Sequence, residues 1–121
     1  MIKKYFIDRE SYSIEDGRIY GEMGYSFCDM DETAYDELRE AVMDATLTIS
    51  EETEEGIEEG EIPVMVVYEC LFNDDAEDFY ASDAVNSRPL VALVGKCEYS
   101  KLVVAAWRRE RKCSIKVIDL V

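Results

Sequence analysis

The clearest strand signal in the chain is the stretch Ile62–Phe72, which runs IPVMVVYECLF. Ile62-Pro63 opens the segment, and Val64–Phe72 follows as a run of mostly apolar residues. β-Branched and aromatic side chains favour extended backbone. An apolar run of this kind is typical of a central strand that is covered on at least one face. We therefore expect the sheet to be built around this segment.

The N-terminal part of the chain predicts a β-hairpin. Residues 2–7 favour a strand, because tyrosine, phenylalanine and isoleucine follow one another there. The Asp-Gly pair at 16–17 indicates a turn that requires positive φ, which is the usual connection of a two-residue hairpin. With these two residues in the loop, Glu15 faces Arg18, and the returning strand extends to about Phe27.

A helix is expected to follow the hairpin. Asp31 or Thr33 can cap its first turn, since Thr33 is followed three residues later by an aspartate in the manner of a capping box. The helix is expected to end near Leu47, where β-branched residues accumulate. Residues 51–61 then form a solvated loop or a frayed helix end. Five apolar residues recur at helical spacing: Ala34, Leu38, Ala41, Val42 and Ala45.

The C-terminal third predicts a strand, a helix and a strand. Residues 90–94 are an apolar strand that ends at a glycine, and residues 101–112 favour a helix capped by Ser100. Residues 113–121 supply the last strand. A hairpin across residues 99–121, with a tight turn near Arg111, is the alternative. The helix residues expected in the core are Leu102, Val103 and Ala106.

These segments predict one domain over residues 1–121 with an α+β fold. The expected sheet is mixed but mainly antiparallel, has about five strands, and carries two helices packed on one face. The connection at residues 73–83 is expected to be a short helix or an irregular loop.

Charge is distributed very unevenly along the sequence. The chain carries 28 acidic and 13 basic residues, for a formal net charge of -15. Residues 29–83 hold 20 of the acids and a single base, Arg39, whereas residues 84–121 hold 3 acids and 8 bases. Solubility of a small domain requires a net charge of only about 2–8. The surplus therefore indicates a binding function for the acidic segment.

Several kinds of catalytic chemistry have no sequence support. The chain has no histidine, which is the commonest general base and a frequent metal ligand. Its glycines form no phosphate-binding loop. The acids around Asp29 and Asp74 do not follow the spacing of a calcium-binding loop. We therefore expect a binding protein and not an enzyme, with no cofactor and no dedicated metal site.

The start of the sequence and its cysteines favour a cytoplasmic protein. Residues 1–10 lack the apolar run of a signal peptide, and no apolar stretch is long enough to span a bilayer. We therefore expect no membrane contact. No C-x-x-C pair occurs, so a zinc site has no support. The cysteines are expected to be reduced and buried: Cys28, Cys70, Cys97 and Cys113.

Two acidic clusters form the candidate binding surface. A nucleic-acid duplex carries one phosphate charge per about 1.7 Å of axis, and carboxylates along a helix and its neighbouring loops can approach that density. A basic nucleic-acid-binding protein would attract such a surface, without nucleic acid being bound directly. Phe79 and Tyr80 would add an anchor. The first cluster comprises Glu51, Glu52, Glu54, Glu55, Glu58, Glu59 and Glu61, and the second Asp74, Asp75, Glu77, Asp78 and Asp83.

The same residues also have structural interpretations. The acids could belong to solvated loops, and Phe79 and Tyr80 to the core. The basic segment 107–112 could grip a phosphate or an acidic partner, with Trp107 stacking. It could instead be a helix C-terminus favoured by the macrodipole, or an internal pairing surface for the acids, and we favour this structural interpretation. Head-to-tail self-association through opposite charges is a further alternative.

In small size, strong acidity and lack of catalytic residues, the chain resembles the inhibitors that phages and mobile elements use against nucleic-acid-targeting defences. Anti-CRISPR proteins and DNA-mimic antirestriction proteins are examples. The resemblance lies in composition, rests on no motif and carries over no functional residue. It implies inhibition of a defence nuclease or a CRISPR effector through its basic channel. The alternatives are an immunity protein or antitoxin that neutralises a basic toxin, and an adaptor domain without an inhibitory role.

Overall fold

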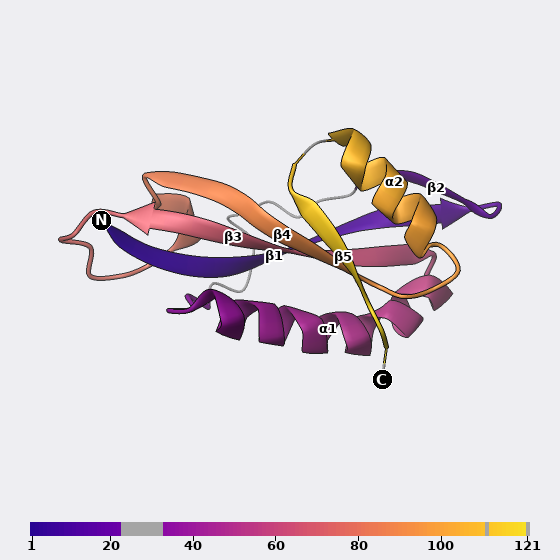
Figure 1. The fold of residues 1–121 in the computed structure, drawn as a ribbon, viewed down its shortest axis with the longest axis horizontal. Coiled ribbons are helices and arrows are strands. Elements are labelled where there is room, and N and C mark those ends of the chain that lie inside the picture. Colours follow the sequence, from indigo (N-terminus) through magenta and orange to yellow (C-terminus); the bar gives the residue numbers. More distant parts are fainter. Residues whose placement is uncertain (23–32, 111, 121) are drawn as a thin grey trace.

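The structure is a computed structural model that describes residues 1–22, 33–110 and 112–120. Along the chain (Figure 1), its elements are β1 (Ile2–Glu15), β2 (Arg18–Glu22), α1 (Leu38–Glu58), β3 (Glu61–Phe72), the 3₁₀ turn η2 (Ala81–Asp83), β4 (Asn86–Gly95), α2 (Ser100–Glu110) and β5 (Ser114–Ile118). The strands form one sheet in the order β2-β1-β3-β4-β5. Among the described strands, β4 and β5 are the one parallel pair, and the other neighbours are antiparallel. The predicted α+β class is therefore confirmed.

β3 is the central strand of the sheet, as its apolar sequence predicts. It pairs with β1 on one side along its whole length and with β4 on the other. Every residue from Ile62 to Val67 is buried. A strand exposed on one face would alternate buried and solvated side chains, so this continuous burial means that both faces are covered.

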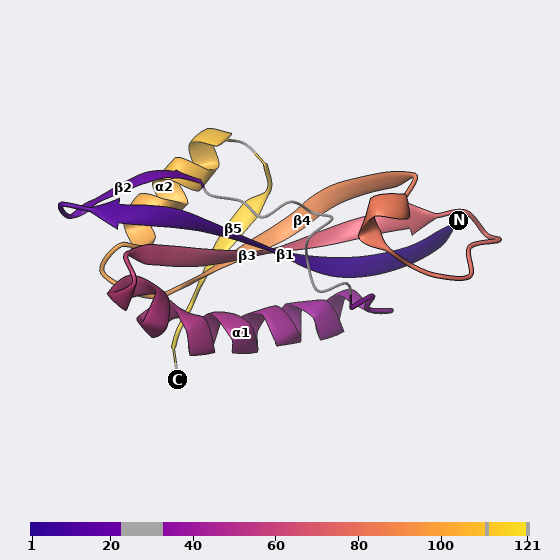
Figure 2. The same ribbon diagram turned by 180° about the vertical axis from the view of Figure 1, so that it is seen from behind.

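The two helices cover opposite faces of the sheet, so the prediction that both pack on one face is wrong. Met65 and Val67 of β3 pack against α1, whereas Val64 and Val66 pack against α2. Successive side chains of a strand point to opposite faces, and Figure 1 and Figure 2 show the helices as two outer layers. The segment β4-α2-β5 is a parallel crossover, which holds its helix against one face. α1 covers the other face.

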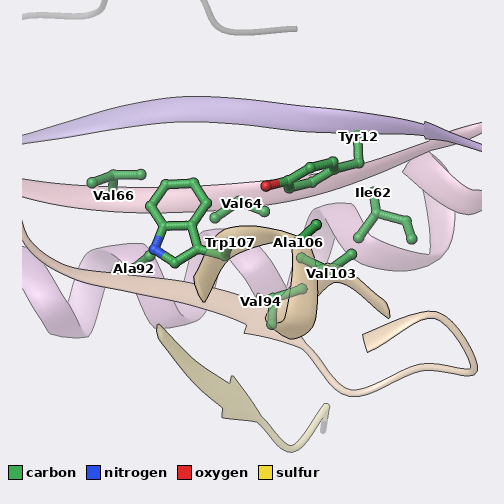
Figure 3. Packing of buried hydrophobic residues seen from close by; sticks show 9 residues of the cluster. All are labelled: Tyr12, Ile62, Val64, Val66, Ala92, Val94, Val103, Ala106 and Trp107. Carbon is green, nitrogen blue, oxygen red and sulfur yellow. The ribbon is translucent and has the colours of Figure 1, made fainter. Parts of the chain in front are cut away.

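Trp107 is the largest fully buried side chain and lies on the α2 side of the sheet. Its indole Nε1 donates a hydrogen bond of 3.0 Å to the carbonyl oxygen of Cys113. Figure 3 shows the ring within the cluster that also holds Val64 and Val66. Because the ring is fully buried, the alternative in which Trp107 stacks on a partner is wrong. Leu102, expected in this core, is instead 46% exposed.

α1 extends further than predicted. The prediction that it ends near Leu47 is wrong, because the helix continues to Glu58. Ile49 and Thr53 are fully buried against the sheet, and Thr53 Oγ1 donates to the carbonyl oxygen of Ile49 at 2.6 Å. Burial of these β-branched residues outweighs their modest intrinsic preference against helix.

The start of α1 also differs from the prediction. The backbone of Tyr35 exchanges two hydrogen bonds of 2.9 Å with that of Tyr5, so the chain is still extended where a capping box at Thr33 would require helix. Glu37 is the N-cap of the observed helix. The alternative cap, Asp31, lies outside the described residues, as does the predicted end of the returning strand at Phe27.

The N-terminal hairpin and the C-terminal helix and strand both form as predicted. Asp16 and Gly17 have φ values of 52° and 72°, which are the positive angles that a two-residue hairpin needs. Glu15 pairs with Arg18 as predicted. At the C-terminal end the helix–strand prediction is confirmed, and the alternative hairpin over residues 99–121 is wrong.

Gly95 sets how closely α1 approaches the sheet, and we expect Gly95→Ala to destabilise the protein by about 1–3 kcal/mol. A Cβ at this position would lie 2.3 Å from Thr53 Oγ1 and 2.9 Å from Leu120 Cδ2. Urea unfolding followed by circular dichroism measures the loss. Gly21→Ala is the matched control, because no described residue lies within 4 Å of its added Cβ. Equal stability of the two variants would contradict the packing of α1 against β4.

Candidate protein-binding surface

The face of α1 opposite the core carries a row of exposed carboxylates. At about 100° per residue, its members fall within roughly 100° of the helix circumference. Arg39, the only base of α1, lies outside this row and is paired with Glu37 at 2.7 Å. We call this surface the acid row, and it consists of Glu40, Asp44, Glu51, Glu54, Glu55 and Glu58.

The first predicted cluster divides into exposed and anchored residues. Glu51, Glu54, Glu55, Glu58 and Glu59 are exposed. Glu52 and Glu61 are half-buried and both meet one guanidinium. Arg9 of β1 approaches Glu52 Oε2 at 3.0 Å and Glu61 Oε2 at 4.0 Å. This contact fastens the acidic end of α1 to the sheet.

The second predicted cluster occupies the connection between β3 and β4. All five of its acids are exposed. The N-terminal ammonium of Met1 lies 3.1 Å from Asp74 Oδ1. Phe79 packs edge-on against Phe72, with ring centroids 5.2 Å apart, and Lys4 Nζ lies 4.6 Å from its centroid. Phe79 is therefore committed to the core, while Tyr80 is 50% exposed.

The two clusters lie at opposite ends of the molecule. Glu61 begins β3, and Asp74 follows the end of the same strand. Twelve residues of extended chain span about 40 Å, and Figure 1 shows the end of α1 and the β3–β4 connection far apart. The structure therefore does not bring the clusters together into one surface.

Two exposed apolar side chains accompany the acid row, and the sequence analysis missed them. Met43 is 63% exposed and Leu47 is 57% exposed. They are one helical turn apart, so they are neighbours on the surface of α1. Glu40 and Asp44, which complete the acid row, were expected on the outward side of the helix but were not among the predicted binding residues. The available signal was the position of 43 and 47 off the apolar stripe, which marks them as outward-facing in a helix.

β1 carries two buried carboxylates that the sequence analysis also missed. Asp8 is 4% exposed and Glu10 is 6% exposed, and both lie on the α2 side of the sheet, opposite Val66 and Val64. Lys112 Nζ donates to Glu10 Oε1 at 3.2 Å. The signal was the two-residue alternation that places both acids on the same face as buried Phe6 and Tyr12.

Burial and nearby carboxylates raise the pKa values of two groups on β3. Burial, and to a smaller degree the charges of Glu10 and Asp8, raise the pKa of Tyr68 to about 12. Burial, followed by the charge of Glu69, raises the pKa of Cys70 to about 11. Both groups are therefore protonated and neutral at pH 7.

We expect stability to fall as the pH rises from about 9 to 11. The ordinary pKa of Cys70 is 9.0 and that of Tyr68 is 10.0, so the unfolded state releases these protons before the folded state does. The contribution of these two groups to the free energy of unfolding is fully present below about pH 9. It is lost as the pH rises through their pKa values in the folded protein. Urea unfolding at a series of pH values measures this, and Cys70→Ala should make the decline shallower. A free energy of unfolding that stays constant across the range would contradict the burial.

A hollow of about 310 Å³ opens between α1 and β1. Its apolar lining includes Ile7 and Met65, and its charged lining is Arg9 and Glu52. This volume is at the lower end for a small-molecule site. Arg9 and Glu52 already bind each other at 3.0 Å, so the hollow offers a ligand no unpaired charge from this pair.

Other features bear on metals, membranes and thiols. Within residues 1–22, 33–110 and 112–120, no group of three acidic, cysteine or histidine residues is placed to hold a metal ion. None of the helices in that part of the chain combines the length and apolar character needed to cross a membrane. Cys70, Cys97 and Cys113 are free thiols, as predicted, but of these three only Cys70 is buried, so the prediction of burial is wrong for Cys97 and Cys113, which are half-buried. Cys28 lies outside the described residues.

Comparison with protein-family models, with curated proteins and with solved structures finds no match for this chain.

Proposed function

We propose that this protein is a non-enzymatic inhibitor whose acid row occupies the basic channel of a nucleic-acid-targeting defence nuclease, in the manner of an anti-CRISPR protein. The observation that carries the proposal is the spacing of the carboxylates on α1. Glu51, Glu54, Glu55 and Glu58 are separated by about 4.5, 1.5 and 4.5 Å along the helix axis, an average of about 3.5 Å, given a rise of about 1.5 Å per residue. One strand of a duplex carries a phosphate every 3.4 Å or so.

The helix that carries the acid row is held firmly on the sheet. Ala41, Ala45 and Ile49 are fully buried beneath the acid row, and Arg9 holds the acidic end of the helix. The carboxylates are therefore presented on a fixed scaffold, which lowers the cost of ordering them on binding. A partner's basic channel would meet a charge pattern that is already arranged.

The position of the glutamates also costs stability, which favours a function over simple solvation. A helix C-terminus disfavours negative charge, and Glu54 and Glu58 are like charges one turn apart. No basic residue lies in the last turn of α1. A cluster of like charges at an unfavourable place is consistent with a binding role.

Removing these charges is therefore expected to stabilise the fold. Glu54→Gln combined with Glu58→Gln should raise the free energy of unfolding by about 0.5–1 kcal/mol, because repulsion and the unfavourable dipole interaction are both relieved. The control, Asp75→Asn with Asp78→Asn, removes the same charge from a connection outside any helix and should change stability less. Urea unfolding at low salt decides the comparison, and a loss of stability in the α1 variant would contradict this account.

The second cluster has a separate role in the proposal. Because it lies about 40 Å from the acidic C-terminal end of α1, only a large partner can touch both that end and this cluster. The chain just before α1 is closer to the cluster, since Lys4 contacts both Asp36 and Phe79. We assign the primary contact to the acid row and a secondary contact to Tyr80 and the five acids around it.

The test is to find the partner and ask what it does. The immobilised protein captures candidates from a host lysate, with a charge-reversed α1 variant as the matched bait. The proposal expects a captured protein that binds only the unchanged bait, is released by high salt, and loses nucleic-acid binding or cleavage when this protein is added. Capture of a secreted or toxic protein encoded beside this gene would instead support an immunity protein. A partner without a nucleic-acid channel, held equally by both baits, would support an adaptor.

A further inference from the structure

We propose that the outward face of α2 binds the outward face of α1 in a second copy of this chain. The face of α2 is defined by five exposed residues, which we call the basic face: Lys101, Leu102, Ala105, Arg108 and Arg109. At about 100° per residue they share roughly 120° of the helix circumference. Val103 and Trp107, both fully buried, occupy the side that packs on the sheet.

The cations of the basic face form no ion pair within residues 1–22, 33–110 and 112–120. No carboxylate of the described residues forms an ion pair with Lys101, Arg108 or Arg109, whereas Lys112, just beyond the helix, is paired with Glu10 and Glu110. Among the residues that the structure describes, three cations on one face are thus left without an ion pair, although the net charge of the chain is -15. Leu102, 46% exposed, lies among them.

The acid row of α1 has the complementary chemistry at the same spacing. Leu47 is followed by Glu54 seven residues later, and Leu102 is followed by Arg109 at the same interval. Seven residues place the two members of each pair about 10 Å apart on one face. Laying one helix along the other therefore pairs leucine with leucine and cation with carboxylate. A nucleic-acid backbone would satisfy the cations but would offer Leu102 no apolar contact, so a second copy fits better.

The fold determines the form of the assembly. α1 and α2 are outer layers on opposite faces of the sheet, as Figure 1 and Figure 2 show. Each copy therefore has one face of each kind, and the two faces point in opposite directions. Different patches that meet in this way produce open, head-to-tail stacks and not a closed dimer. Exposed ion pairs are individually weak and screened by salt, so the stacks form at high protein concentration and low ionic strength.

Sedimentation velocity of the purified full chain tests this over a concentration series, at about 0.01 M and about 1 M salt. At low salt the average mass should rise with concentration and pass that of a dimer, and at high salt it should fall to that of one chain. The variant Lys101→Glu, Arg108→Glu, Arg109→Glu should associate at least about tenfold more weakly. Leu102→Ser should weaken association too. Circular dichroism checks that each variant remains folded.

The second measurement reverses the charge of α1 and then mixes this variant with the α2 variant. The variant Glu51→Lys, Glu54→Lys, Glu55→Lys, Glu58→Lys should not stack alone, because both of its faces are then basic. Mixed with the α2 variant, it should stack again. Asp74→Lys with Asp75→Lys alters charge elsewhere and should leave stacking intact. A single-chain mass at every concentration, a closed dimer, or stacking unaffected by the α2 variant would overturn the proposal. Binding of a DNA duplex through the basic face, without self-association, would overturn it in favour of nucleic acid.

Discussion

Trp107→Ala is expected to lower the free energy of unfolding by about 3–5 kcal/mol, the largest effect of any single substitution considered for this chain. Trp107 is fully buried between α2 and the sheet, so removing the ring leaves a cavity beside Val64 and Val66. It also removes the donor to the carbonyl oxygen of Cys113, which precedes β5. Both losses weaken the packing of α2 on the sheet and its connection to β5.

Urea unfolding followed by far-ultraviolet circular dichroism measures this change, since Trp107 is the only tryptophan available for fluorescence. Tyr80→Ala is the control, because it removes a large ring that is 50% exposed and should cost no more than about 0.5 kcal/mol. Trp107→Phe should fall between the two variants. A loss below about 1 kcal/mol for Trp107→Ala would mean that α2 is not anchored through this ring.

Where local chemistry determines the structure, the sequence predicts the fold well. The Asp-Gly pair at 16–17 can hardly form anything other than a tight turn, and the pairing of Glu15 with Arg18 follows from it. The apolar segment Ile62–Phe72 marks the centre of the sheet because a strand buried on both faces needs such a run. The succession of strands and helices followed from these signals and was confirmed.

Where tertiary contacts decide, the sequence predictions were wrong. Which face a helix covers depends on the path of its connections, and the parallel pairing of β4 with β5 cannot be read from either strand alone. The length of α1 depended on the burial of Ile49 and Thr53 against β3 and β4, which no propensity reports. Leu102 lies in an apolar run with Val103, and only the orientation of α2 separates exposed from buried members.

For the candidate site too, the sequence predicted the local features but not those that depend on tertiary contacts. Charge alone located both acidic clusters, because charge is a property of composition. It did not show that about 40 Å separates them, that Arg9 neutralises Glu52 and Glu61, or that Phe79 packs on Phe72. Met43 and Leu47 lie off the apolar stripe, which was the available signal in the sequence, and the structure shows that both are exposed.

Reversing the acid row is expected to weaken partner binding by at least about a hundredfold, because attraction in a basic channel is replaced by repulsion. The variant is Glu51→Lys, Glu54→Lys, Glu55→Lys, Glu58→Lys, and all four side chains are exposed, so the fold should be retained. The control carries the same change of charge at the other end of β3: Asp74→Lys, Asp75→Lys, Glu77→Lys and Asp78→Lys. It should weaken binding much less. Isothermal titration calorimetry with the purified partner measures both affinities, and equal losses would show that only total charge matters.

Competition with nucleic acid tests the central claim most directly. The partner is titrated with this protein at several fixed concentrations of the duplex or guide–target hybrid that it normally binds. If the acid row occupies the same channel, the apparent dissociation constant rises linearly with the nucleic-acid concentration from its value in the absence of nucleic acid, without reaching a plateau. Formation of a ternary complex, with an affinity for this protein that nucleic acid leaves unchanged, would contradict the account.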